Sequence, residues 1–322
     1  LRPHVRYKTV FPRPIPGNSR LQKLLTPQQL HRLCIREHYD IEVAYLEGVT
    51  ARIISGCESP DTKTVCWIHS TLGSTADGAS CFRSEAEAAE CYGRFQRIAC
   101  VSQWTRDAFR AAFANVKHVD TFYNTIESSA ILSGAQAPAQ RMPVHEGEIR
   151  LISVGSLKPV KGFDRLLRIH ARLRREGYPV RTCLVGQGPD LEALRRQAAQ
   201  CGETDSVTFL GFDKNPWQYV AKSHLFVCSS HSEGFSTAAT EALIVGTPVC
   251  TVEVSGMKEM LGDNNEWGIV TDNDEEALYR GIRQLLDDPA LLAHYREMAA
   301  IRGRTFSTEN TVSAVQELLN TL

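Results

Sequence analysis

The feature that most constrains the fold is an alternation of short apolar runs with amphipathic segments, which is regular from about residue 150 onward. The run 150–155 is followed by the amphipathic segment 163–176, and the pair 180–186 and 190–200 repeats the pattern. Such alternation predicts βαβ units and a mainly parallel sheet. Further strands are predicted at 207–210, 225–229, 248–252 and 268–271.

The first half of the chain shows the same pattern less regularly. Strands are predicted at 41–46, 64–69, 97–102 and 118–123, and helices at 27–36, 84–94 and 104–113. The segment 128–147 is rich in Ala, Ser, Gly and Pro without periodicity, which predicts a linker. We therefore expect two α/β domains, 1–145 and 146–322, that face each other across a cleft. The last helix, 310–322, is a candidate for packing back on the first domain.

Composition and charge exclude several classes of protein. The 322 residues are 43% hydrophobic and carry a net charge of −1, which argues against a general nucleic-acid binder. No apolar run approaches the roughly 18 residues that a membrane-spanning helix needs. The ten cysteines include no C-x-x-C pair. That usage favours a reducing cytoplasm over a disulfide framework or a structural zinc site.

The segment after the predicted strand 225–229 has the composition of a phosphate site. A polar turn follows the strand, and a helix is predicted to start near Phe235. Its first turn carries the small residues Ser236, Thr237 and Ala238, which would let a ligand approach the unpaired backbone N–H groups. A helix N-terminus with free amides attracts phosphate through its donors and its dipole.

Two carboxylates flank this turn. Glu233 precedes the predicted helix, and Glu241 lies about two turns inside it. Carboxylates are unsuited to holding phosphate but accept hydrogen bonds from hydroxyl groups, which points to a sugar. The alternative is that Glu233 is an ordinary acid at a helix N-terminus and Glu241 a solvated surface residue.

The turn after the run 150–155 carries a cation. Gly155 ends the run, and Lys161 and Gly162 stand where the next helix begins. Lys161 could place its charge on phosphate oxygens, although surface lysines before helices are common. The spacing is not that of a P-loop.

Two other motifs have structural explanations. Gly186-Gln-Gly188 starts like a dinucleotide fingerprint, but Leu191 stands where a third Gly or Ala is needed, and a tight turn explains the glycines equally well. Asp272-Asn-Asp274 imitates a metal-binding D-x-D motif, but a helical segment follows it, so we predict a helix N-cap. No metal site is predicted.

One histidine of the first half stands at a strand end. His69 lies where the apolar run 64–69 meets its loop, a place suited to a base or a hydrogen-bond donor that faces a cleft. A single histidine is as often structural, and the residues leave both interpretations open.

Taken together, these stretches resemble the retaining glycosyltransferases of family 4, in the GT-B superfamily with glycogen and sucrose synthases. The main match is E-x7-E at Glu233 and Glu241, followed by Gly246-Thr-Pro-Val249. The supporting matches are Val154-Gly-Ser-Leu, Lys161-Gly-Phe, Leu184-Val-Gly-Gln-Gly-Pro, Val207-Thr-Phe-Leu-Gly, Trp267-Gly-Ile-Val, Trp67-Ile-His, Cys100-Val-Ser and Tyr123-Asn. The resemblance covers nearly the whole chain.

The resemblance implies a catalytic set and a mechanism without a metal. Glu233 would contact hydroxyls of the donor sugar, Lys161 would neutralise the diphosphate, and His69 would lie beside the acceptor and the transferred sugar. The donor would be a UDP- or GDP-sugar, and no cofactor is implied. The acceptor hydroxyl would attack from the face that the nucleotide diphosphate leaves.

The same resemblance implies the rest of the donor site. The amides of Thr237 and Ala238 would hold the diphosphate, Glu241 would bind the ribose, and Gly211 and Phe212 would border the nucleobase. The expected donor-binding set is Gly155, Ser156, Lys161, Gly211, Phe212, Glu233, Gly234, Phe235, Ser236, Thr237, Ala238 and Glu241.

Two departures from the family pattern stand out. The family has Arg after the Gly of the first loop, where this chain has Ser156, so Lys158 is a candidate replacement. Nothing before Ile41 resembles the family's opening strand and Gly-rich loop, so we expect an N-terminal domain that lacks one βαβ unit.

We therefore expect a cytoplasmic glycosyltransferase that transfers a sugar to a glycan or lipid-linked acceptor in surface polysaccharide synthesis. Peripheral association with the inner membrane surface is left open. The alternatives are a nucleotide-sugar-binding protein without turnover and a nucleotide-sugar 2-epimerase on a similar fold.

Overall fold

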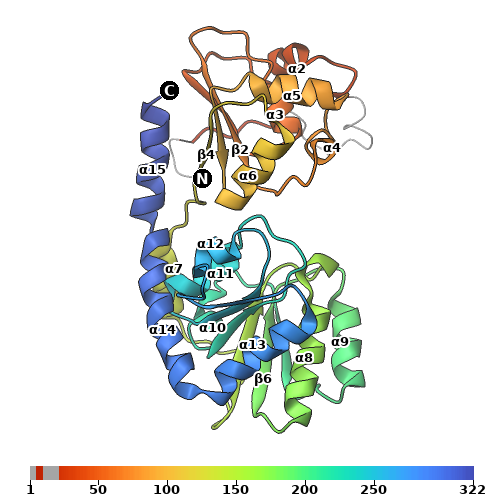
Figure 1. Ribbon diagram of the computed structural model, residues 1–322, viewed down its shortest axis with the longest axis vertical. Coiled ribbons are helices and arrows are strands. Elements are labelled where there is room, and N and C mark those ends of the chain that lie inside the picture. The colour runs from red at the N-terminus through yellow and green to blue at the C-terminus, as the bar shows by residue number, and fades with distance from the viewer. Residues whose placement is uncertain (1–4, 10–21) are drawn as a thin grey trace. The chain divides into compact units, whose positions relative to one another are not determined.

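The computed structural model describes residues 5–9 and 22–322. It contains two α/β units, each built on a parallel sheet (Figure 1). The first unit comprises Leu1–Thr121 with Leu322, and the second comprises Phe122–Thr321. Residues 1–4 and 10–21 of the predicted first domain lie outside the described residues. The predicted parallel α/β architecture is confirmed.

The first unit contains a four-stranded parallel sheet in the order β1-β2-β3-β4. Its strands are β1 (Ile41–Ala44), β2 (Lys63–Ile68), β3 (Arg97–Cys100) and β4 (Val119–Thr121). Its helices are α2 (Pro27–Cys34), α3 (Val49–Ile54), α4 (Thr75–Gly78), α5 (Glu85–Gly93) and α6 (Gln103–Ala112). The side chains of Phe82, Tyr92, Phe109 and Phe113 form an aromatic cluster in its core, with ring centroids 4.8–5.4 Å apart in the contacting pairs.

The second unit contains a six-stranded parallel sheet in the order β10-β9-β8-β5-β6-β7. Its strands are β5 (Ile149–Val154), β6 (Val180–Val185), β7 (Val207–Gly211), β8 (Leu225–Cys228), β9 (Val249–Val252) and β10 (Ile269–Thr271). The helices are α7 (Ser128–Ala135), η1 (Pro159–Lys161), α8 (Phe163–Arg175), α9 (Leu191–Gln200), α10 (Trp217–Val220), α11 (Thr237–Ile244), α12 (Met257–Leu261), α13 (Glu275–Asp287), α14 (Pro289–Gly303), η2 (Arg304–Phe306) and α15 (Thr308–Asn320).

Every strand predicted from the sequence is present, within two residues of its predicted ends. The strands of the second unit are covered by two groups of helices (Figure 1): α8 packs against α9 and α13, while α11 packs against α7, α10 and α14. Because helices cover the sheet, strands such as β6, β8 and β9 are buried along their whole length, and β8 (Leu-Phe-Val-Cys) is a continuous apolar run in the sequence.

The boundary between the units lies earlier in the chain than the predicted one at 145/146. The segment 128–147 was predicted to be a linker, but its first part is helix α7, which packs on α10 and α11. Ile131 and Ala135 of α7 are buried, and the Asn215 side chain donates to the Gly134 carbonyl at 2.9 Å. These contacts make α7 part of the second unit.

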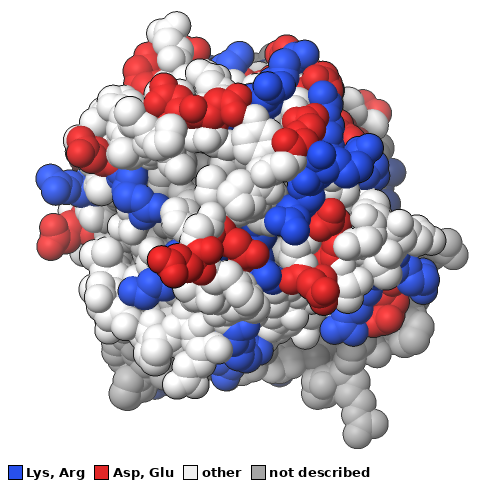
Figure 2. Space-filling view, turned by 90° about the horizontal axis from the view of Figure 1, so that it is seen from below, with Lys and Arg blue, Asp and Glu red and all other residues white. Residues whose placement is uncertain are grey.

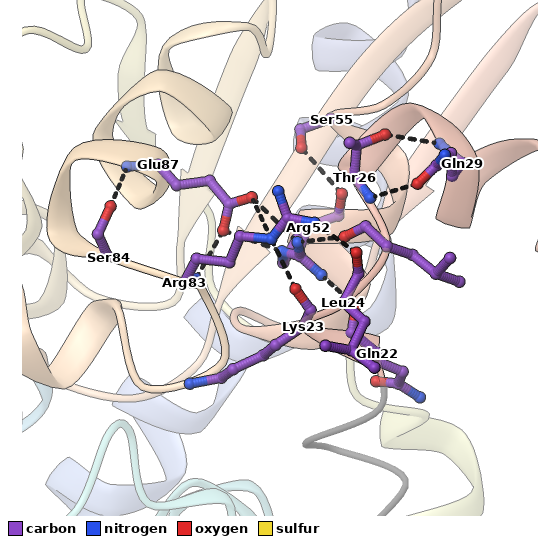
Figure 3. A network of polar contacts seen from close by, with 11 residues as sticks. Gln22, Lys23, Leu24, Thr26, Gln29, Arg52, Ser55, Arg83, Ser84 and Glu87 are labelled. Carbon is purple, nitrogen blue, oxygen red and sulfur yellow. Dashed lines mark hydrogen bonds and ion pairs between the residues drawn. The ribbon is translucent and has the colours of Figure 1, made fainter.

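A buried arginine organises the helices of the first unit (Figure 3). Arg52 of α3 is 1% exposed and donates to both carboxylate oxygens of Glu87 on α5, at 3.1 and 3.0 Å. It also donates to the carbonyls of Gln22 and Leu25, at 2.9 and 2.7 Å. Because a buried guanidinium must find acceptors for its donors, these contacts tie the segment before α2 to α3 and α5.

Charges of both signs are mixed on one face of the protein. On the face shown in Figure 2, Lys and Arg side chains are interleaved with Asp and Glu, so the described residues form no continuous basic surface there. Among residues 5–9 and 22–322, no helix has both the length and the apolar character needed to cross a bilayer.

Candidate functional site

The strand order of the second unit reverses between β5 and β8, and two loops meet at their carboxyl ends. The Val160 carbonyl accepts from the His231 backbone N–H at 2.7 Å, and the Ser229 hydroxyl donates to the Lys161 carbonyl at 3.1 Å. Ligands of open parallel sheets bind at such a reversal, because the loops diverge there to opposite faces. Seven residues of the predicted donor-binding set lie in these two loops: Gly155, Ser156, Lys161, Glu233, Gly234, Phe235 and Ser236.

Gly162 makes this close approach possible. Its φ is +60°, and a Cβ at this position would lie 2.1 Å from the Ser229 carbonyl oxygen. A side chain would therefore force the two loops apart. Gly186 and Gly188 have a similar role, since a Cβ on either would lie about 2 Å from a carbonyl oxygen of the β5 loop, at 1.8 and 2.2 Å. This crowding supports the tight-turn interpretation of the Gly-Gln-Gly motif.

We expect Gly162→Ala to destabilise the second unit by about 2–5 kcal/mol, because left-handed backbone costs a non-glycine residue about 1–2 kcal/mol and overpacking adds about 1–3. Gly202→Ala is the matched control, since its φ is +75° but nothing lies within 4 Å of its added Cβ. Denaturant unfolding of both variants measures the difference. Equal losses would contradict the steric role of Gly162.

Arg165 of α8 holds the loop that follows β8 by hydrogen bonds. It was not among the residues predicted from the sequence. The side chain is 3% exposed and donates to the carbonyls of Ser229 and Ser230 at 2.6 and 2.7 Å. It also donates to the Asn273 side-chain oxygen at 2.9 Å, and burial lowers its pKa. The one available signal was an arginine on the apolar face of a predicted helix.

The segment 272–274 is explained by the same contacts. The Asp274 side chain accepts from the Ala277 backbone N–H at 2.8 Å, which confirms the predicted N-cap of α13. The neighbouring Asn273 donates to the His231 carbonyl at 3.2 Å in addition to accepting from Arg165. The segment 272–274 therefore caps helix α13 and holds the loop after β8 by hydrogen bonds.

The structure brings Lys161 and Glu233 together. The Lys161 ammonium lies 2.7 and 2.9 Å from the two carboxylate oxygens of Glu233, and the Ser230 hydroxyl donates to the nearer oxygen at 2.5 Å. The two side chains are 25% and 10% exposed. Lys161 is therefore not a free surface lysine, and the alternative of an ordinary helix acid does not describe Glu233.

Helix α11 begins at Thr237, two residues later than predicted. Ser236 is its N-cap, and its hydroxyl accepts from the Ala239 backbone N–H at 3.4 Å. The N–H groups of Thr237 and Ala238 point out of the first turn without an intrahelical acceptor, as at every helix N-terminus. Thr237 and Ala238 follow Glu233 by four and five positions, so these amides stand at the end of the loop that carries Glu233.

Phe235 lies outside the helix because its side chain belongs to an aromatic cluster. The ring is 7% exposed, stacks on Tyr123 at a centroid distance of 5.3 Å and lies 5.9 Å from Phe306. Its place in the predicted donor-binding set therefore rests on its backbone, since the side chain anchors the loop before α11.

Glu241 is half-buried on the second turn of α11, so it is not a solvated surface residue. Burial raises the pKa of this carboxyl above its usual range. The indole N–H of Trp217 lies near the carboxylate without reaching hydrogen-bond geometry, and it lowers the pKa less than burial raises it. Glu241 is thus a desolvated acceptor without a cation partner, which suits a neutral donor such as a ribose hydroxyl.

The remaining predicted donor residues lie at strand ends of the second unit. Phe212 follows the end of β7 with 60% of its surface exposed, which is unusual for a phenylalanine. A Cβ on the preceding Gly211 would meet nothing within 4 Å. Gly155 borders the Lys161 side chain, and the following Ser156 is exposed, as is Lys158.

His69 lies in the first unit, at the end of β2. Its ring Nε2 is buried and has no hydrogen-bond partner within the protein, and burial lowers its pKa. A buried polar atom without a partner costs free energy and is common where a ligand supplies the partner. That His69 serves the same reaction as Lys161 and Glu233 stays a prediction.

One group of described side chains could supply three metal ligands: His31, Glu42 and Cys57 of the first unit. The His31 Nε2 and the Glu42 carboxylate already lie 2.7 Å apart as a part-buried pair. None of these residues is in the predicted site.

The two units and the loop geometry of the second define the GT-B class of fold. The structure of Anabaena Alr3699/HepE in complex with UDP matches with a TM-score of 0.75 and 20% sequence identity, over 92% of this chain and 81% of that one. The predicted fold class is confirmed.

The chain belongs to the family Glycosyl transferases group 1, whose model matches residues 139–302. An N-acetylgalactosamine-N,N'-diacetylbacillosaminyl-diphospho-undecaprenol 4-alpha-N-acetylgalactosaminyltransferase of Campylobacter jejuni is 32% identical, over 48% of this chain and 42% of that protein. A D-inositol 3-phosphate glycosyltransferase of Salinispora arenicola is 33% identical, over 58% and 44%. In both alignments the matched region is less than half of the relative's length.

Proposed function

We propose that this protein is a retaining glycosyltransferase of family 4, which transfers a sugar from a UDP- or GDP-sugar to a glycan or lipid-linked acceptor in surface polysaccharide synthesis. The observation that carries the proposal is the Lys161–Glu233 pair, which is held by two joined loops, one of which leads into the N-terminus of α11 with the amides of Thr237 and Ala238. A cation and helix amides suit a diphosphate, and a carboxylate suits sugar hydroxyls.

The chemistry follows from where charge develops. As the bond between the anomeric carbon and the diphosphate breaks, negative charge grows on the leaving oxygen. We expect Lys161 and the α11 amides to stabilise that charge, since fixed groups of this kind lower the barrier. The acceptor hydroxyl then bonds to the anomeric carbon from the face that the diphosphate leaves, and its proton passes to a phosphate oxygen. These residues supply the charge without a metal ion.

The acceptor and the compartment are supported less directly. The Campylobacter relative is named for transfer to a diphospho-undecaprenol-linked sugar, which supports a lipid-linked acceptor at the inner membrane surface. All ten cysteines are free thiols, and six of them are buried as small core residues, which supports the reducing cytoplasm. The HepE complex makes UDP-sugars the first donors to test.

Calorimetry with UDP and GDP, followed by incubation with UDP- and GDP-sugars with and without a lipid-linked acceptor, tests the proposal. We expect nucleotide binding and an acceptor-dependent glycosylated product with the donor's anomeric configuration. Epimerised donor formed without acceptor would instead identify a 2-epimerase. Binding without any product would identify a nucleotide-sugar-binding protein, and the absence of binding would refute the donor site.

Glu241→Gln is expected to weaken nucleotide binding while stabilising the unliganded protein. Loss of a charged hydrogen-bond acceptor costs about 1.5–3 kcal/mol, which is roughly ten- to a hundredfold in affinity. Because burial raises the pKa of Glu241, its ionised form costs stability, and the cost exists above that pKa. The variant should therefore gain thermal stability at neutral pH and lose this advantage as the pH falls below that pKa.

Glu317→Gln is the control for the Glu241 variant, since Glu317 is an exposed acid on α15. Calorimetry with UDP and GDP and melting curves between pH 4 and 8 measure both effects. If Glu241→Gln bound nucleotide as the wild type does, Glu241 would have no part in the donor site.

A further inference from the structure

Three side chains with metal-binding atoms converge in the first unit. His31 lies on α2, Glu42 on β1 and Cys57 in the loop after α3. The His31 Nε2 and a Glu42 carboxylate oxygen lie 2.7 Å apart, and one ligand atom from each of the three residues lies within 4.8 Å of the other two. Eleven or more residues separate any two of them in the chain, so the sequence carries no ligand spacing that would indicate the group.

The Glu42 carboxylate is held on the covered side of its sheet. Glu42 is 7% exposed, whereas the next residue, Val43, is 39% exposed, because successive side chains of a strand point to opposite faces. The side chain of His31 is 13% exposed, and Cys57 is half-buried. The group therefore borders the surface, where an ion has access, while its carboxylate is removed from water.

A close backbone contact brings Cys57 to α2. A Cβ on the preceding Gly56 would lie 2.0 Å from the Pro27 carbonyl oxygen, so a larger residue would force the loop away from the helix. Arg32 of α2 and Glu58, which follows Cys57, form an ion pair at 2.6 Å. The loop after α3 is thus held against α2 by contacts that need no ligand.

An ion pair between His31 and Glu42 does not account for the whole group. A carboxylate removed from water needs a compensating charge, which a protonated His31 supplies, but the pair gives Cys57 no part. A divalent cation uses all three side chains, because the Glu42 carboxylate and a Cys57 thiolate carry two negative charges and a neutral imidazole carries none. A ligand set of nitrogen, oxygen and sulfur suits zinc, whereas magnesium and calcium take oxygen ligands.

We propose that His31, Glu42 and Cys57 bind one zinc ion, with a water molecule as the fourth ligand. Zinc holds such ligands at about 2.0–2.3 Å in a tetrahedron, which places neighbouring ligand atoms about 3.3–3.6 Å apart. The His31–Glu42 pair at 2.7 Å opens by less than about 1 Å, and the other pairs, within 4.8 Å, close by no more than about 1.5 Å. Side-chain rotations supply movements of that size. The proposal departs from the sequence-based expectation of no metal site.

The ion joins three elements of the first unit: α2, β1 and the loop after α3. The ligands meet only in the folded chain, so the free energy of zinc binding adds to the stability of this unit. None of the predicted donor-binding residues takes part. The proposal therefore stands or falls independently of the proposed function.

Cobalt(II) is the probe, because its absorption reports both the ligands and their geometry. Titration of the reduced full chain should show one equivalent bound, with a thiolate-to-cobalt charge-transfer band and the intense d–d bands of a tetrahedral site. One equivalent of zinc should abolish both. C57S should lose the charge-transfer band. H31Q keeps the thiol, so it tests the site even if C57S fails to fold, and it should weaken cobalt binding by more than about a hundredfold, the upper cost of losing a hydrogen-bond partner of a ligand.

C34S and C201S are the matched controls, because the chain has ten free thiols. Cys34 is a half-buried thiol of the same helix as His31, and Cys201 is exposed. Both variants should keep the wild-type spectrum and stoichiometry. A charge-transfer band that persists in C57S would assign the metal to another thiol and overturn the proposal. Cobalt binding without such a band in the wild type, or no saturable binding, would overturn it as well.

A second readout is hydrogen exchange of the β1 amides. An ion that binds only the folded state favours it by a factor of one plus the ratio of free ion to Kd. We therefore expect exchange in β1 to slow about a hundredfold when free zinc is a hundred times its Kd, and to remain unchanged by zinc in C57S. Zinc binding that left exchange in β1 unaltered in the wild type would refute the role of the ion in joining these elements.

Discussion

Replacing Lys161 by alanine is expected to slow sugar transfer by about a hundred- to a thousandfold, the usual effect of removing one group that stabilises charge in a transition state. The ammonium lies 2.7 Å from the Glu233 carboxylate, and the loop that carries Glu233 leads directly into the N-terminus of α11. Steady-state rates at saturating donor measure the effect.

Lys158→Ala is the matched control for this experiment. Lys158 is an exposed lysine of the same loop, three residues earlier, and exposed substitutions change free energies by about 0.5 kcal/mol or less, roughly twofold in rate. A loss at Lys158 as large as that at Lys161 would instead show that Lys158 replaces the arginine that the family has at Ser156. A wild-type rate for Lys161→Ala would remove Lys161 from the catalytic set.

Arg52→Met is expected to destabilise the first unit by about 3–5 kcal/mol, because breaking a buried ion pair leaves the partner charge without compensation. Glu87 is 14% exposed and would keep the Arg83 backbone N–H at 2.6 Å and the Arg83 guanidinium at 3.9 Å (Figure 3). The carbonyls of Gln22 and Leu25 would lose their donors. Hydrogen exchange of amides in β2 and β3 reports the free energy of unfolding of this unit alone.

Arg32→Met provides the comparison on the surface. The Arg32–Glu58 pair is 72% and 53% exposed, and such pairs contribute about 0–1 kcal/mol. The double variant Arg52→Met/Glu87→Met should recover part of the loss, since it removes both buried charges. If Arg52→Met cost no more than Arg32→Met, the network would not hold the segment before α2.

The sequence predicted the strands and the donor loops well, for local reasons. Each strand of a covered parallel sheet is a short apolar run, and the run is visible without knowledge of its neighbours. The N-cap at Asp274 was equally visible, because a cap and the helix it starts are adjacent in the chain. The family motif at Glu233 and Glu241 then pointed to the loops that the structure joins.

Helix α7 and the start of α11 show where local patterns fail. The sequence of α7, Ser-Ser-Ala-Ile-Leu-Ser-Gly-Ala, has no apolar stripe of helical period, so its burial against α10 and α11 could not be read from it. Phe235 fits the start of a helix by local criteria. It stays outside α11 because its ring stacks on Tyr123, which lies 112 residues away in the chain.

By itself, therefore, the sequence determined the order of the strands along the chain, the class of the fold and the loops that carry the candidate residues. The tertiary structure alone decided which of those residues meet. Lys161 pairs with Glu233, which lies 72 residues later in the chain, and Arg165 donates a hydrogen bond to Asn273, which lies 108 residues later. The Glu47 carboxylate accepts from the His69 backbone N–H, with helix α3 between the two residues in the sequence. The reason is physical: a strand is specified by its own side chains, whereas an ion pair or a buried hydrogen bond is specified by the packing that brings two distant backbones within 3 Å.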